Sequence, residues 1–118
     1  MAKAEEVAKK LIKLGIPLNV EKVYGRRIFA SLKMKHLVRF AEAMFKDLGA
    51  RLSFISPVDK GLELEVVYHF DVGGVLVNVK VAIPKRLNKL PSLVSVYKAA
   101  EWMEREIHDL MGIEFEGN

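Results

Sequence analysis

The chain of 118 residues has no cysteine, which excludes disulfide bonds, a cysteine nucleophile and an iron–sulfur cluster held by thiolates of this chain. Threonine and glutamine are also absent, while lysine and glutamate are frequent, a composition that suggests a thermophilic source. No apolar run approaches the roughly 20 residues of a membrane-spanning helix, and residues 1–10 lack the apolar centre of a secretory signal. We therefore expect any membrane association to be indirect.

The residues that are present suffice for one hydrophobic core. The chain is 51% apolar and has the length of a single domain, which we expect to span residues 1–118. Its charge is uneven: residues 1–60 hold 13 Lys or Arg against 6 Asp or Glu, whereas residues 61–118 hold 6 against 9. Such polarity would orient the domain between an acidic and a basic partner, unless the charges only solvate the surface.

Helices and strands alternate in the first half of the chain. Apolar residues at helical spacing predict amphipathic helices over residues 4–14 and 34–48, which end at glycines. The lysines outside the first helix could contact anionic lipid, although core packing alone explains its apolar stripe. Weaker signals predict strands at residues 19–24, 27–32 and 52–56. Residues 57–61 are expected to form a turn.

The clearest β signal is a hairpin around Gly73-Gly74. Apolar residues alternate with polar ones on both sides of this pair, starting at Leu62, and a two-residue turn would place Phe70 opposite Val77. The polar face of the hairpin would carry Glu63, Glu65, His69, Asn78 and Lys80. Helices must cover the apolar face, so the sequence predicts an α+β fold, a two-layer sandwich of a mainly antiparallel sheet covered by helices.

Residues 84–91 are expected to form a loop, and a final helix is predicted after Pro91. The stripe expected to pack on the core consists of Ala99, Ala100, Met103, Ile107, Leu110 and Met111. One flank holds Trp102, Glu106 and Asp109 with Arg105 beside them, and the other holds Tyr97, Glu101, Glu104 and His108. Gly112 suits the left-handed conformation that closes a helix. At the start, Ser92 or Ser95 could cap the first free amides, and we favour Ser95.

The run from Ala99 to Phe115, AAEWMEREIHDLMGIEF, resembles the signature of the 30 kDa subunit of respiratory complex I and of its relatives in membrane-bound nickel-iron hydrogenases. The family pattern is two small residues, a polar residue and Trp, then Glu-Arg-Glu, two residues, Asp, two residues, Gly, Ile or Val, any residue, and Phe. The chain contains every fixed position: Ala99, Ala100, Trp102, Glu104, Arg105, Glu106, Asp109, Gly112, Ile113 and Phe115. Pro91-Ser92 and the Val67-Tyr68-His69-Phe70 strand extend the resemblance over most of residues 60–118.

The chain departs from the complex I pattern in two places, and its economy resembles the hydrogenase branch. Tyr97-Lys98 stands where complex I members have an aromatic residue followed by proline. The family pattern also continues into a basic tail that relatives use against neighbouring subunits, whereas this sequence stops at Asn118.

The resemblance implies a cofactor-free structural subunit of a membrane-bound, complex I-like oxidoreductase, most closely a nickel-iron hydrogenase, with a quinone-reducing dehydrogenase as the alternative. Its partners would be the catalytic large subunit and the iron–sulfur small subunit, on the cytoplasmic side of the cell membrane. Iron–sulfur clusters and nickel-iron or quinone chemistry would belong to those partners, and electron transport would be coupled to ion translocation. The resemblance also implies that some signature charges are buried in networks that tie the loop before the final helix and the Ile113–Phe115 extension to the sheet.

Eight residues are the candidate partner-binding and signature positions: Trp102, Glu104, Arg105, Glu106, Asp109, Gly112, Ile113 and Phe115. An aromatic residue and Arg beside carboxylates are typical of interface centres, so Trp102 would anchor the contact, unless it lies at the edge of the core. Arg105 would bridge Glu106 or Asp109 to a partner group. Gly112 and Phe115 would set the path of the exit strand.

Two other function classes fit the sequence less well. Glu104 and His108 share a helix face and could form a metal half-site or an acid–base pair, but a metal needs three convergent ligands. We therefore expect no catalytic or metal site in this chain. The isoelectric point near 9.4 would permit nucleic-acid binding, but Tyr68 and Phe70 belong to the core row, where they cannot stack on bases. We expect no nucleic-acid partner.

Overall fold

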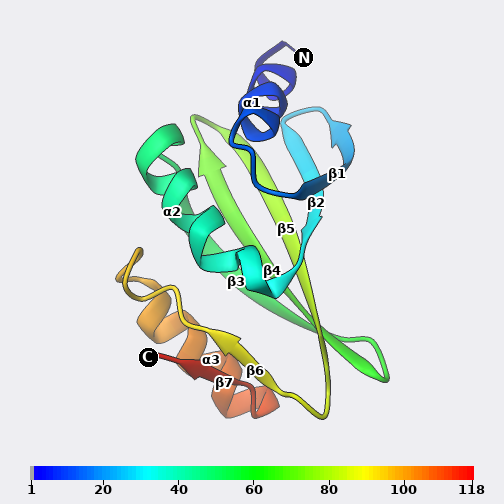
Figure 1. Cartoon of the computed structure of the whole chain (residues 1–118), viewed down its shortest axis with the longest axis vertical. Helices are drawn as coiled ribbons and strands as arrows, with labels where there is room; N and C mark the ends of the chain where they lie inside the picture. The colour runs from blue at the N-terminus through cyan, green and yellow to red at the C-terminus, as the bar shows by residue number, and fades with distance from the viewer. Residues whose placement is uncertain (1) are drawn as a thin grey trace.

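The computed structural model describes residues 2–118 and shows an α+β fold (Figure 1). Its helices are α1 (Ala2–Lys13), the 3-10 turn η1 (Met34–His36), α2 (Leu37–Leu48) and α3 (Ala100–Met111). Its strands are β1 (Leu18–Tyr24), β2 (Arg27–Leu32), β3 (Arg51–Asp59), β4 (Glu63–Val72), β5 (Val75–Pro84), β6 (Lys89–Pro91) and β7 (Glu114–Glu116). None of the helices in residues 2–118 is long and apolar enough to cross a bilayer.

The main sheet has five strands in the order β1-β2-β5-β4-β3. Only β2 and β5 run parallel, so the sheet is mainly antiparallel, as predicted. The β4–β5 hairpin turns at Gly73-Gly74 and places Phe70 opposite Val77, which confirms the predicted register. The alternation of apolar and polar residues along β4 and β5 therefore determines which face of the sheet is buried.

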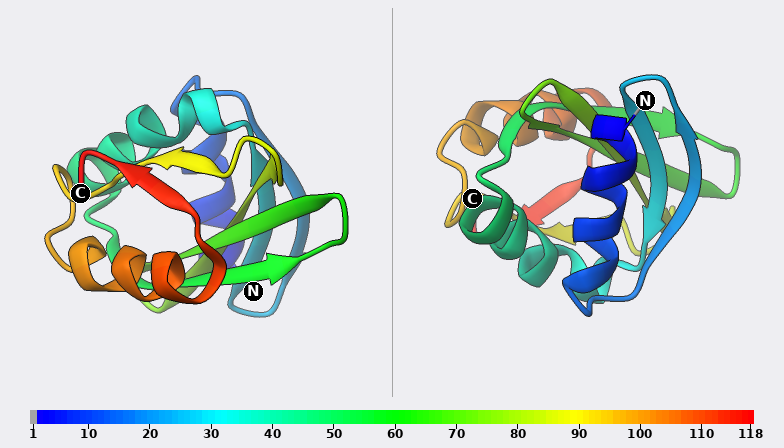
Figure 2. Two further views of the ribbon diagram at one scale, coloured as in Figure 1. Left: turned by 90° about the horizontal axis from the view of Figure 1, so that it is seen from below. Right: turned by 90° about the horizontal axis from the view of Figure 1, so that it is seen from above.

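Helices cover the apolar face of this sheet. Figures 1 and 2 show α1 and α2 side by side over it, with α3 beyond β3 at one end. Phe40 of α2 meets Phe70 of β4 edge to face, with ring centroids 5.7 Å apart. α3 contacts β3, the edge strand, and leaves one of its own sides free.

Three details of the sheet differ from the sequence prediction. Leu62 is 91% exposed, because β4 begins at Glu63 and Leu62 lies in the turn before it. β3 continues through Pro57 to Asp59, which an edge strand tolerates because one side of its backbone needs no partner. Asn78, expected on the solvent face, is buried, where it donates to Ile28 O and lies 2.6 Å from His69 Nδ1.

The loop expected over residues 84–91 contains a strand. β6 pairs in parallel with β7, so the chain after α3 returns beside the segment that precedes α3. Glu114 N donates to Asn88 O at 2.9 Å, and Ser92 N donates to Glu116 O at 2.8 Å, at the two ends of this pairing. The small sheet and α3 therefore form one unit, which carries all of the signature residues.

Candidate functional site

Only some residues of the predicted apolar stripe are buried on the inner side of α3. Ala100, Met103 and Ile107 are buried, as expected, whereas Ala99 is exposed and Leu110 is 78% exposed. Leu110 lies at the margin of the stripe, about 40° from Glu106 on the helical projection, and in the last turn of α3. The prediction that Leu110 packs on the core is therefore wrong.

Trp102 lies on the outer side of α3 and is 49% exposed. It is accompanied there by Glu106 and Asp109, which are both exposed, as their helical spacing predicts. Arg105 pairs in this structure with Glu101, one turn earlier, at 3.4 Å, rather than with Glu106 or Asp109. Because the side chains of this pair are 62% and 60% exposed, the interaction is screened by water and leaves the guanidinium accessible.

Glu104 departs from the helical projection, whereas its burial agrees with the buried signature charges that the resemblance implies. The helical projection places it on an outer flank, but its exposure is 0%. Its carboxylate accepts hydrogen bonds from Ser92 Oγ at 2.6 Å, Leu93 N at 2.8 Å and Asn118 Nδ2 at 3.0 Å. Burial raises the pKa of Glu104, and the three hydrogen bonds oppose that rise. Glu104 thus joins α3 to the segment before it and to the end of the chain.

The raised pKa of Glu104 gives the domain a pH dependence. With a folded-state pKa above the ordinary 4.5, the native state binds the proton more tightly than the unfolded state does. The contribution of Glu104 to the free energy of unfolding is therefore highest below pH 4.5. It falls as the pH rises from 4.5 through the raised pKa of the folded state. We expect urea titrations of Glu104→Gln to lack this decline. An identical pH profile in both proteins would contradict the assignment.

The start of α3 differs from the predicted cap. The helix begins at Ala100, and its N-cap, Ala99, makes no side-chain hydrogen bond, so the preference for Ser95 is wrong. Ser92 instead accepts from Val94 N at 3.0 Å and donates to Glu104. Ser92 therefore caps the turn before the helix and connects that turn to the buried carboxylate.

The end of α3 is held by Gly112 and by Asn88, a residue that the sequence pattern did not single out. Gly112 has φ of 73° and donates to His108 O at 2.8 Å, which confirms the predicted left-handed cap. Asn88 Nδ2 donates to Gly112 O at 2.6 Å, and His108 Nδ1 donates to Ile113 O at 2.9 Å. Asn88 has φ of 50°, in the left-handed region that Asn tolerates better than most residues. An asparagine in the segment before the final helix was therefore the signal that the sequence offered for this position.

Gly112 offers a direct test of this cap. Gly112→Ala should lower the free energy of unfolding by about 1 kcal/mol, because a Cβ disfavours the left-handed conformation. The space itself is sufficient, since the nearest atom to such a Cβ would be Asn88 Nδ2 at 3.6 Å. Gly112→Asn, the matched control, should lose less in the same urea titration. Equal stability of the Ala variant and the parent would contradict the backbone argument.

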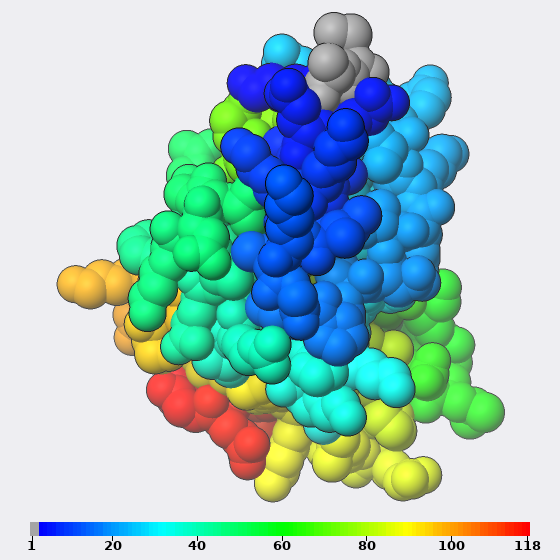
Figure 3. Space-filling view, turned by 45° about the horizontal axis from the view of Figure 1, so that its top comes forward, coloured from blue at the N-terminus to red at the C-terminus, as the bar shows by residue number. Residues whose placement is uncertain are grey.

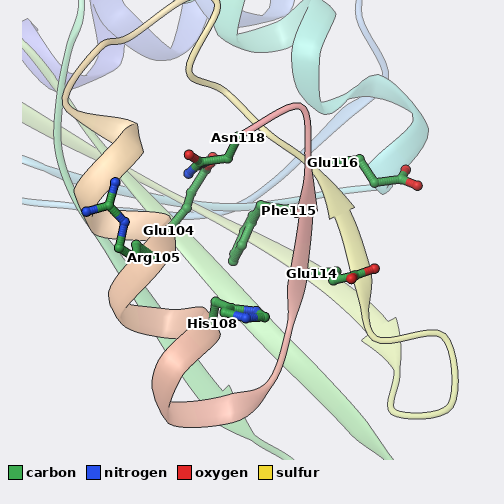
Figure 4. A pocket seen from close by; sticks show the side chains of 7 residues that line it. All are labelled: Glu104, Arg105, His108, Glu114, Phe115, Glu116 and Asn118. Carbon is green, nitrogen blue, oxygen red and sulfur yellow. Dashed lines mark hydrogen bonds between the residues drawn. The ribbon is translucent and has the colours of Figure 1, made fainter.

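A pocket of about 410 Å³ lies between α3 and β7. Its lining is Glu104, Arg105, His108, Glu114, Phe115, Glu116 and Asn118. Figure 4 shows the Phe115 ring between strand and helix, while the Glu114 and Glu116 side chains point away from the helix. Glu104 and His108, the pair weighed as a metal half-site or an acid–base pair, have other partners in this structure: both Glu104 oxygens accept from other donors, and His108 Nδ1 donates to Ile113 O. Residues 2–118 contain no cluster of three metal-ligating side chains.

Comparisons with known proteins agree on one family. Residues 30–118 match the model of the respiratory-chain NADH dehydrogenase 30 Kd subunit. The chain is 36% identical over 94 residues to the C subunit of NADH-quinone oxidoreductase from Streptomyces coelicolor, a match that covers 72% of this chain and 38% of that protein. The corresponding protein of Chloroherpeton thalassium is 38% identical over 87 residues, which cover 66% of this chain and 36% of that protein. The chain thus spans less than half the length of these relatives.

Two solved structures are similar to this one. A chain of the membrane-bound sulfane sulfur reductase, an archaeal respiratory membrane complex, superposes with a TM-score of 0.89 at 29% identity, over 98% of this chain and 72% of that chain. The Nqo5 fragment 1–134 superposes with a TM-score of 0.69 at 24% identity, over 96% of this chain and 95% of that chain, and supports the fold alone. With the family match over residues 30–118, the chain belongs to the family of the respiratory-chain NADH dehydrogenase 30 Kd subunit.

Proposed function

We propose that this chain is a structural subunit of a membrane-bound, complex I-like oxidoreductase and that it docks through the outer side of α3 on the catalytic large subunit. It would form a single domain, carry no redox cofactor and sit on the cytoplasmic side of the membrane, next to subunits that hold the iron–sulfur clusters. Electron transfer in those subunits would be coupled to ion translocation.

The observation that carries the proposal is the half-exposed Trp102. An indole 49% exposed on a helix leaves a large apolar area in water, and burial of that area against a partner is favourable. Beneath it, the same helix is fixed to the domain by the buried Glu104 and its three donors. The indole is therefore presented on a rigid support, which reduces the entropy lost on binding.

Within the family, we place the chain in the branch that includes membrane-bound nickel-iron hydrogenases. One support is Tyr97-Lys98, which departs from the complex I pattern. The other is the TM-score of 0.89 with a chain of a complex whose name gives sulfane sulfur, and not quinone, as the compound that it reduces. The alternative, a quinone-reducing dehydrogenase, is supported by the relatives that are named as parts of NADH-quinone oxidoreductase. A nucleic-acid-binding role is not favoured, because Tyr68 and Phe70 are buried in the core.

Purification of the complex from native membranes tests the proposal. The full chain carries an affinity tag, the membrane is solubilised in mild detergent, and the copurifying proteins and metals are identified by mass spectrometry and elemental analysis. We expect a stoichiometric large subunit together with iron–sulfur proteins, and nickel in the large subunit would select the hydrogenase branch. Quinone reduction without nickel would select the dehydrogenase branch. Recovery of the chain alone, or with RNA, would overturn the proposal.

A further inference from the structure

A second exposed apolar surface lies at one end of the molecule. We call it the tip surface: the β3–β4 turn (residues 59–63), the loop after β5 (residues 85–89) and Leu110 of α3. Leu62 is 91% exposed, Leu110 is 78% exposed and Leu87 is 40% exposed. The β3–β4 turn, the loop after β5 and the C-terminal end of α3, which carries Leu110, lie at the lower end of the molecule in Figure 1. Single exposed leucines are common, but several on one surface indicate an interaction site.

The parts of the tip surface are connected to one another. Lys85 N donates to Leu62 O at 3.2 Å, and Lys85 Nζ pairs with Asp59 Oδ1 at 2.9 Å. Figure 3 shows the turn in green and the loop in yellow as adjoining projections. Asp59, Lys85 and Leu110 also line one pocket of about 400 Å³. The surface therefore has a hollow that a partner's side chain would fill.

The charge of the tip surface restricts what it can bind. Residues 85–89 include Lys85, Arg86 and Lys89, and the turn holds Lys60 beside Asp59 and Glu63, so the tip surface has four basic against two acidic side chains. Lys85 pairs with Asp59 and Lys89 with Glu116, but among residues 2–118 no carboxylate pairs with Lys60 or Arg86 within 4.0 Å. A partner segment that carries carboxylates would be attracted here, and a basic one would be repelled.

The tip surface continues the outer side of α3. Trp102, Glu106 and Leu110 stand four residues apart and form one row along the helix. With a rise of about 1.5 Å per residue, the row is about 12 Å long. An ordinary protein interface of about 800 Å² per partner extends further than this, so one partner chain can cover both ends of the row.

We propose that the tip surface is a second docking site for the large subunit that contacts Trp102, and that it takes a segment with an aliphatic side chain flanked by Asp or Glu. The inference rests on the proposed function, since it requires an assembled complex, but it uses residues outside the family signature. The aliphatic side chain enters the hollow beside Leu110, and the flanking carboxylates face Lys60 and Arg86.

Site-specific photo-crosslinking in the assembled complex tests the proposal. The photoreactive amino acid p-benzoylphenylalanine replaces Leu62, Leu110 or Trp102 one at a time, or Tyr24 as an exposed control in the β1–β2 hairpin. Membranes of cells that make the complete complex are irradiated, and the crosslinked peptides are sequenced by mass spectrometry. We expect positions 62 and 110 to capture an acidic, aliphatic peptide of the subunit that position 102 captures.

A charge reversal adds an independent readout. Lys60→Glu with Arg86→Glu should reduce the crosslinking yield at position 62 by roughly tenfold, because like charges then face the partner. Lys9→Glu with Lys13→Glu on α1 makes the same change in net charge and should leave the yield unchanged. Equal yields in the two double variants would overturn the proposal.

The outcomes separate this inference from the proposed function. If position 102 captures the large subunit while positions 62 and 110 capture nothing, lipid, a second copy of this chain, another subunit or a non-acidic peptide, the tip proposal fails and the proposed function stands. If position 102 does not capture the large subunit, the proposed docking fails and the tip proposal fails with it.

Discussion

Glu104→Ala is expected to lower the free energy of unfolding by about 3 kcal/mol. The substitution removes the acceptor of three donors, of which Leu93 N is backbone in a fully buried residue and cannot turn toward water. A buried donor left without an acceptor costs about 1–3 kcal/mol, and the cavity left by the side chain adds to this loss. Urea unfolding followed by circular dichroism measures the change.

Two further variants show whether the loss comes from the carboxylate. Glu104→Gln keeps the size but places an amide N–H₂ against one of the donors, so its loss should lie between those of the parent and the Ala variant. Glu101→Ala removes an exposed carboxylate from the same helix and should change the free energy of unfolding by less than about 0.5 kcal/mol. If Glu101→Ala and Glu104→Ala were equally stable, the network around Glu104 would not hold the domain together.

Trp102→Ala is expected to weaken binding to the large subunit by about 2 kcal/mol or more, which is roughly a 30-fold rise in Kd. The indole would lose its buried contact in the complex, whereas in the free domain half of it is already in water. The fold should therefore persist. Titration of the purified chain against the complex assembled without it measures Kd, and circular dichroism reports the fold.

Tyr24→Ala is the matched control for this prediction. Tyr24 is also a large exposed aromatic residue, at 69%, but it lies at the end of β1, away from α3. Its replacement should leave Kd unchanged. A Trp102→Ala chain that unfolds would show instead that Trp102 belongs to the core, and one that binds with the parent's Kd would remove it from the interface.

Much of the fold was predictable because it follows from local pattern. Alternation on both sides of Gly73-Gly74 determines the register of Phe70 and Val77, since a shift by one residue would turn every apolar side chain to solvent. Gly112 was predictable for a similar reason, as few residues adopt the left-handed conformation that ends α3. Both features depend on residues that are neighbours in sequence or across one turn.

The errors concern residues whose environment is made by distant segments. Charged side chains usually lie outside, but the donors to Glu104 come from Ser92 and Leu93, 12 and 11 residues earlier, and from Asn118, 14 residues later. Helical periodicity places Leu110 inside, yet it does not show that the last turn of α3 packs on the core through Met111 and leaves Leu110 exposed. As a result, the buried Glu104 fixes α3 to the rest of the fold, and Leu110 belongs to the outer surface of the helix.

Hydroxyl-radical footprinting of Trp102 tests the central claim most directly, that the inner side of α3 holds the domain and its outer side binds a partner. Trp102 is the single tryptophan of the chain, and fragmentation of its peptide in the mass spectrometer separates oxidation of Trp102 from oxidation of the neighbouring Met103. Its oxidation rate is compared in the free chain and in the assembled complex, with Tyr24 as the internal reference. The account predicts a severalfold lower rate for Trp102 in the complex and no change for Tyr24. Equal oxidation of Trp102 in both states would contradict it.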